Sequence, residues 1–111
     1  MAEPGYVYFV QPSRGGPIKV GWSENPWGRL SDLQQGCWEE LRIIATLRLL
    51  PDQDGYGVGA GSFERAIHER FRKHRLQREW FSFDGEFKDF IDALLGGEAI
   101  SIGRFTIHEA A

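Results

Sequence analysis

Four side chains that could act together in chemistry come from separate parts of the sequence: Tyr8, Lys19, Arg29 and Glu64. A carboxylate is a hard oxygen ligand that suits Mg²⁺. A guanidinium can grip a phosphate through two parallel hydrogen bonds, and a phenol beside an ammonium loses its proton more readily. Each residue type is common on protein surfaces, so these four become informative only if the fold brings them together.

Glu64 also has a histidine four residues later, at His68, and this spacing puts both on one helical face. Such a pair is compatible with a metal site but is equally an ordinary surface pair, and no second ligand cluster follows, so a structural zinc is not expected. The glycine-rich segment 55–61 just before it has neither P-loop nor dinucleotide-binding spacing. We therefore expect residues 51–61 to be a flexible loop, not a phosphate site.

The elements that must position these residues begin with a β-hairpin, predicted from the aromatic and β-branched runs 5–11 and 17–23. A tight loop at residues 12–15 would set the register so that Tyr8 lies opposite Lys19 on one face and the other face is apolar. The other expected pairs are Tyr6 with Gly21, Val7 with Val20, and Phe9 with Ile18.

A first helix is expected from Pro26 to Gly36, because Asn25 can cap free amides and proline suits the first helical position. Arg29 would lie at the border of the apolar stripe, from where it can reach the edge of the sheet. That stripe consists of Trp27, Leu30 and Leu33.

Further along, a third strand is expected within residues 39–50, a second helix over residues 62–75 and a third helix from Asp84 to Gly96. A short extended piece is expected at 79–83, and one more strand, or a hairpin bent at Gly103, at 99–107. The expected core stripes are Phe63, Ala66, Ile67 and Phe71 on the second helix, and Phe87, Phe90, Ile91, Leu94 and Leu95 on the third.

These elements predict an α+β fold, in which a small antiparallel sheet of about three strands is flanked by three helices. The 111 residues, 41% of them hydrophobic, suit one domain with its core at 5–95 and a C-terminal extension at 96–111. The single cysteine, the lack of a long apolar run and the lack of a leader favour a cytoplasmic protein without membrane contact.

The net charge of −3 argues against nucleic-acid binding by bulk electrostatics, but the basic residues are unevenly distributed. Six of the thirteen fall between positions 65 and 78: Arg65, Arg70, Arg72, Lys73, Arg75 and Arg78. This run is either a solvated helix face or a surface for nucleic acid.

The order of these residues resembles the signature of the GIY-YIG nuclease family. The matching pieces are Tyr6-Val7-Tyr8, Lys19-Val20-Gly21, Arg29, Glu64 with His68 and Phe71, and Glu79-Trp80-Phe81. Together they cover residues 5–83 and are most similar to the small phage and bacterial branch of that family. The sequence departs from the pattern where Tyr6 replaces a glycine and Lys19 replaces the second motif's tyrosine, and Trp22 stands where a histidine would follow.

The resemblance implies a GIY-YIG-like fold and a metal-dependent DNA endonuclease. In that interpretation Tyr8 is the general base, Lys19 favours its phenolate, Arg29 grips the phosphate and Glu64 holds Mg²⁺ or Mn²⁺. DNA would be bound by Arg65, His68, Arg72 and Arg75, with Tyr6, Gly21, His68 and Glu79 as secondary candidates for the site. Two alternatives remain: an inactive nucleic-acid-binding module of the same fold, and a small phage or bacterial interaction protein acting as an inhibitor.

Overall fold

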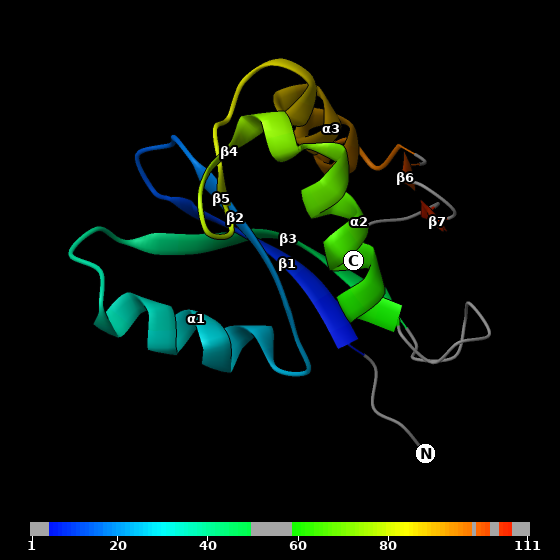
Figure 1. The fold of residues 1–111 in the computed structure, drawn as a ribbon. Helices are drawn as coiled ribbons and strands as arrows, with labels where there is room; N and C mark the ends of the chain where they lie inside the picture. The colour runs from blue at the N-terminus through cyan, green and yellow to red at the C-terminus, as the bar shows by residue number, and fades with distance from the viewer. Residues whose placement is uncertain (1–4, 50–58, 99, 103–104, 108–111) are drawn as a thin grey trace.

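The computed structural model describes residues 5–49, 59–98, 100–102 and 105–107. A five-stranded antiparallel sheet has the order β3-β1-β2-β5-β4 (Figure 1). Its strands are β1 (Gly5–Pro12), β2 (Ile18–Ser23), β3 (Leu41–Leu49), β4 (Arg75–Gln77) and β5 (Trp80–Phe81). The α+β class and the first three strands are confirmed. The sheet is wider than expected because the short hairpin of β4 and β5 extends it beside β2.

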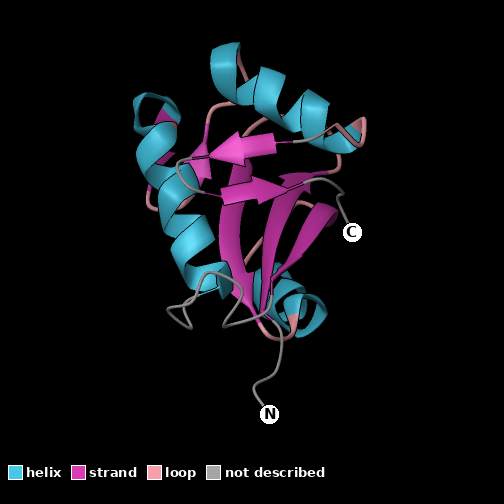
Figure 2. Ribbon diagram, turned by 90° about the vertical axis from the view of Figure 1, so that its right-hand side faces the viewer, coloured by secondary structure: helices cyan, strands magenta, loops and turns pink. Residues whose placement is uncertain are grey.

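Three helices cover the two faces of this sheet: α1 (Pro26–Gln35), α2 (Gly59–Arg70) and α3 (Gly85–Leu95) (Figures 1 and 2). Helix α1 packs on the face that carries Tyr8 and Val10. Helices α2 and α3 cover the opposite face, where the larger core contains Val7, Phe9 and the phenylalanines of both helices. No helix in the described ranges is long and apolar enough to cross a membrane.

The predicted register of the first hairpin is wrong by two positions. Tyr8 lies opposite Gly21 and Lys19 lies opposite Val10, while Tyr6 pairs with Ser23. The turn falls one residue later than expected because two adjacent glycines, Gly15 and Gly16, adopt the left-handed values φ 92° and φ 102° that the loop requires. The other observed pairs are Val7 with Trp22 and Phe9 with Val20.

A shift of two positions preserves the faces of the hairpin, since side chains alternate along a strand with a period of two. Val7, Phe9, Ile18 and Val20 are therefore all fully buried in the core, as expected. Tyr8 and Lys19 still share the other face of the sheet, although they are not direct neighbours.

Helix α1 begins and ends where the sequence predicts. The Asn25 side chain accepts a hydrogen bond of 3.1 Å from the Gly28 amide, and Gly36 is the C-cap. Trp27, however, is 62% exposed and does not belong to the buried stripe. The apolar cluster on this side of the sheet extends along the helix only to Leu30, Leu33 and the following Cys37.

Helix α2 is shifted towards the N-terminus relative to the predicted range 62–75. The segment Gly59–Gly61, expected to be part of the flexible loop, forms its first turn, and the rest of that loop up to residue 58 lies outside the described residues. These small residues allow close packing: a Cβ on Gly5 would lie 2.8 Å from Ala60 Cβ. The Cβ that Gly61 lacks would lie 3.4 Å from the Trp22 indole nitrogen.

At its other end α2 stops at Arg70, so the prediction that Arg72 and Arg75 lie on the helix is wrong. Buried Phe71 is followed by a 3₁₀ turn, η1 (Arg72–His74), and the chain then enters β4. Anchoring of Phe71 against the rings of Phe87 and Phe90 accounts for the change of direction.

Helix α3 follows Asp84 as predicted, and Phe87, Phe90, Ile91 and Leu94 are buried. Leu95, which was also expected in the stripe, is 54% exposed because it lies one position past the buried spacing at the end of the helix. The C-terminal hairpin expected over 99–107 is confirmed as β6 (Ile100–Ile102) and β7 (Phe105–Ile107), and its bend at Gly103 lies outside the described residues.

Candidate active site

Three of the four predicted residues, Tyr8, Arg29 and Glu64, line one hollow of about 540 Å³. Glu79, a secondary candidate, lines it as well, and the other lining residues are Trp22, Ser23, Glu24 and Asn25. A second hollow of about 350 Å³ shares Trp22 and Glu64 with the first and is completed by Gly61, Ser62, Arg65 and His68. Side chains from four separate elements therefore meet around Trp22 and Glu64.

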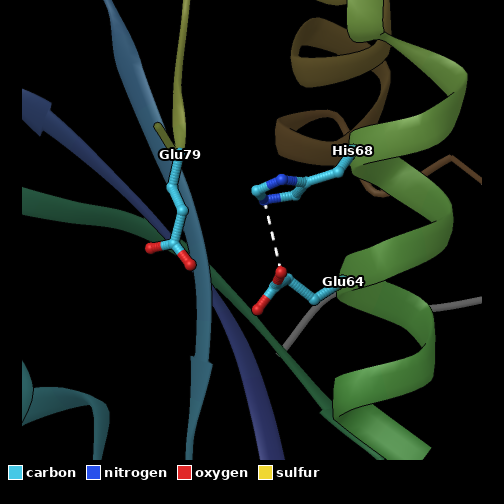
Figure 3. A group of neighbouring side chains, drawn as sticks. All are labelled: Glu64, His68 and Glu79. Carbon is cyan, nitrogen blue, oxygen red and sulfur yellow. Dashed lines mark ion pairs between the residues drawn. The ribbon is translucent and has the colours of Figure 1, made fainter. Parts of the chain in front are cut away.

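The site forms where the sheet is incomplete. Strand β5 pairs with Ile18 and Lys19 of β2, and past this point α2 lies beside β2. The Val20 N–H donates to the Glu79 carbonyl oxygen at 3.0 Å, which places Glu79 next to the same edge. Figure 3 shows the result: Glu64 and His68 project from α2 towards β2, and Glu79 approaches from the segment before β5.

Glu64, His68 and Glu79 form a compact group whose potential ligand atoms all lie within 4.8 Å of one another. Glu64 Oε1 is 3.3 Å from His68 Nε2, and the side chains of these two residues are only 15% and 20% exposed. Burial raises the pKa of the Glu64 carboxyl, His68 opposes this, and the negative charge of Glu79 raises it further. Two close carboxylates with hard oxygen donors suit a divalent cation such as Mg²⁺.

Tyr8 is buried to 2% exposure, and this burial is the main reason that its pKa is raised above the ordinary 10.0. A hydrogen bond from the Arg29 side chain lowers the Tyr8 pKa, whereas the charges of Glu79 and Glu64 raise it. The phenol is therefore neutral at physiological pH when the site holds no further positive charge.

Lys19 does not act on Tyr8 in the way that the sequence suggested. Its ammonium forms an ion pair with the Glu79 carboxylate, and the Lys19 side chain is only 9% exposed. The cation that lowers the Tyr8 pKa is Arg29. The prediction of a cross-strand Tyr8–Lys19 pair is thus wrong, because the register places Gly21 opposite Tyr8.

The remaining predicted residues are distributed unevenly. Arg65 and His68 line the second hollow, whereas Arg72 and Arg75 lie on η1 and β4. Tyr6 is half-buried on β1 and lines neither of these two hollows. Trp22 lines both hollows but is not among the site residues predicted from the sequence. Its position directly after the second motif, Lys19-Val20-Gly21, is the signal that could have indicated it.

The basic run 65–78 is divided between helix α2, the 3₁₀ turn η1 and the β4–β5 hairpin. Arg70 and Arg72 are engaged by Glu86 and Glu69, at 3.0 Å and 3.4 Å. Arg65 lines the second hollow, and the three remaining cations, Lys73, Arg75 and Arg78, are exposed and form no ion pair within the described chain. Since β4 leads through Arg78 directly to Glu79, these cations lie on the approach to the site.

Gly21 is required by the placement of Tyr8. A Cβ at Gly21 would lie 2.5 Å from the Tyr8 hydroxyl oxygen and 2.6 Å from its Cζ. We expect Gly21→Ala to destabilise the fold by about 1–3 kcal/mol through overpacking, which lowers the melting temperature, and to slow any cleavage that depends on Tyr8. Gly36→Ala is the matched control, because its nearest atom would be 4.0 Å away. Equal melting temperatures for the two variants would contradict this placement of Tyr8.

The fold and the site together define a small α+β domain in which two carboxylates, an arginine and a tyrosine line one groove beside β2. The chain belongs to the T5orf172 domain family, which matches residues 5–95. The match runs from β1 through α3 and includes every site residue described above. This domain is related to nuclease-type domains of phages, which suggests a nuclease-like or DNA-binding role. Neither the curated proteins nor the solved structures contain a match.

Proposed function

We propose that this protein is a metal-dependent DNA endonuclease of the GIY-YIG type. The observation that carries the proposal is the convergence on one hollow of Tyr8 from β1, Arg29 from α1, Glu64 from α2 and Glu79 from the turn between β4 and β5. Hydrolysis of a phosphodiester requires a base for the attacking water and positive charge at the phosphate, and this set provides groups for both. Membership of the T5orf172 domain family also supports a nuclease-like function.

A divalent cation, Mg²⁺ or Mn²⁺, held by Glu64 and Glu79 would supply positive charge to the phosphate and offset the two carboxylates that raise the Tyr8 pKa. The Tyr8 hydroxyl would first lose its proton to solvent, and the resulting phenolate oxygen would then accept the proton of the attacking water. Arg29, which already donates to that oxygen, presents its remaining N–H groups to the phosphate. Lys19 keeps Glu79 in place through their ion pair.

The direct test is a plasmid-nicking assay with Mg²⁺, with Mn²⁺ and with EDTA. Nicking that needs the cation and stops with EDTA is the expected result. DNA binding without cleavage under every condition would favour the inactive binding module. Two observations favour that alternative: the raised pKa of Tyr8, and Lys19 in place of the second motif's tyrosine.

The interaction-protein alternative is favoured by the exposure of Trp27 and Trp38, which are 62% and 85% exposed. Its test is a pull-down in which a partner is retained after nuclease treatment.

We expect DNA to be bound through the exposed cations of η1 and the β4–β5 hairpin, Lys73, Arg75 and Arg78. Each phosphate contact releases counterions, so Lys73→Gln with Arg75→Gln should weaken binding to all sequences alike and reduce the salt slope of log K by about one unit per lost contact. Binding measured by fluorescence anisotropy across a salt series checks this.

Arg42→Gln is the control for the Lys73/Arg75 variant, because Arg42 is an exposed arginine on β3, at the opposite edge of the sheet. An unchanged salt slope in the Lys73/Arg75 variant, or an equal loss in the Arg42 variant, would place the DNA on another surface.

A further inference from the structure

The ring of His68 is directed at two oxygen atoms. His68 Nε2 lies 3.0 Å from the Val20 carbonyl oxygen and 3.3 Å from Glu64 Oε1. A carbonyl oxygen and an ionised carboxylate can only accept hydrogen bonds. An unprotonated Nε2 would point its lone pair at both oxygens, and protonation of Glu64 would still leave the Val20 oxygen facing that lone pair. Nε2 must therefore carry a hydrogen atom.

The Val20 carbonyl explains why a donor is needed at this point. Val20 is fully buried, and in the described part of the sheet its carbonyl lies beyond the last pair that β5 forms with β2. A buried carbonyl without a donor is costly, so His68 takes the place of the missing strand. The ring is also fixed by Phe81, with centroids 4.9 Å apart and planes at 83°.

We propose that His68 is a positioning residue rather than a metal ligand: its Nε2–H caps the Val20 carbonyl and holds Glu64 in place. A histidine nitrogen binds a metal through its lone pair. Nε2 is the ring nitrogen that faces Glu64, while Nδ1 lies on the side of the ring away from it (Figure 3), and Nε2 has no lone pair to offer while it donates to Val20. The ligand set then reduces to the oxygens of Glu64 and Glu79, which suits Mg²⁺ or Mn²⁺ better than Zn²⁺. The metal part of this inference rests on the proposed function, whereas the protonation of Nε2 does not.

The protonation can be tested on the unaltered protein by long-range ¹H–¹⁵N NMR of the histidine side chains, with the His68 signals assigned from the spectrum of His68→Gln. The expected result is an Nε2–H for His68 both before and after addition of Mg²⁺. A neutral ring protonated only at Nδ1, or loss of the Nε2 hydrogen when Mg²⁺ is added, would overturn the proposal.

The positioning role can be tested with two variants that differ in one property. His68→Leu removes the donor, and we expect it to raise the Mg²⁺ concentration for half-maximal cleavage about 10- to 100-fold, with an unchanged KM for DNA. His68→Gln keeps an N–H donor and should retain most of the Mg²⁺ affinity. His74→Gln is the control, since His74 pairs with Asp84 at 3.2 Å, outside the site.

Melting temperatures identify any variant that is unfolded at the assay temperature. Equal losses of Mg²⁺ affinity in the Gln and Leu variants would show that the ring nitrogen itself is a ligand. If the unaltered protein cleaves nothing and binds no Mg²⁺, the proposed function fails, while the NMR result still decides the protonation of His68.

Discussion

Glu64→Gln is expected to abolish divalent-dependent cleavage while it raises the melting temperature at neutral pH. The change removes one of the two carboxylates at the sheet edge and almost no volume. Loss of a metal's charge stabilisation amounts to several kcal/mol, which corresponds to a fall in rate of at least about 10³-fold. Nicking rates at saturating Mg²⁺ and thermal melts of the same samples measure the two effects.

The sign of the stability change follows from the raised pKa of Glu64, whose main cause is burial. Folding disfavours the ionised carboxylate, so this group destabilises the fold at pH values above its raised pKa. The penalty decreases as the pH falls from the raised pKa towards the ordinary glutamate value of 4.5, and it is absent below that value. The gain in melting temperature should therefore be present at about pH 7.5 and absent near pH 4.

Glu69→Gln is the matched control for this prediction. Glu69 lies on the same helix, is 74% exposed and pairs with Arg72 on the surface. Glu69→Gln should leave the cleavage rate unchanged. It should change the stability only by the small contribution of a surface ion pair. A folded Glu64→Gln protein that nicks DNA at the normal rate would show that the cation is bound elsewhere.

Tyr8→Phe is expected to reduce cleavage by about 10²- to 10⁴-fold, the usual contribution of a general base. Only the hydroxyl is lost, and the ring keeps its contacts with Val10 and Leu41, so the variant should remain folded. Because Glu64 and Glu79 are untouched, the Mg²⁺ concentration for half-maximal cleavage should stay the same. Single-turnover cleavage over a Mg²⁺ titration separates these two quantities.

Tyr6→Phe is the control for Tyr8, since Tyr6 is two residues away on the same strand and lines neither hollow of the site. Its cleavage rate should be unchanged. A Tyr8→Phe protein that cleaves as fast as the Tyr6 variant would exclude the phenol as the base and leave the water to be activated by another group.

Local signals in the sequence predicted much of the fold correctly. Asparagine before proline marks the start of α1, and the apolar spacing of Phe87, Phe90 and Leu94 marks α3, because capping and helical periodicity depend on residues within a few positions. The predicted end of α2 is wrong because the chain changes direction after Phe71, where this ring packs against two rings of α3. Helical periodicity within residues 62–75 contains no information about that contact.

In the first hairpin, the prediction of which side chains share a face is correct although the predicted register is wrong. The turn was placed one residue too early, yet Tyr8 and Lys19 share a face as expected, since a register shift of two positions leaves the alternation intact. The candidate site residues Tyr8, Arg29, Glu64 and Glu79 were likewise all named from the sequence, through the order of motifs along the chain.

The sequence by itself therefore determined the three helices, the first three strands and the faces of the hairpin, all of which follow from short-range patterns. The order of motifs along the chain determined the set of residues that could do chemistry. Tertiary structure decided how those residues interact. The Lys19–Glu79 pair joins positions 60 residues apart, and the His68 contact with Val20 joins positions 48 apart. The direction of the Tyr8 pKa depends on burial by several elements at once, because desolvation is a property of the packed interior and not of any local segment.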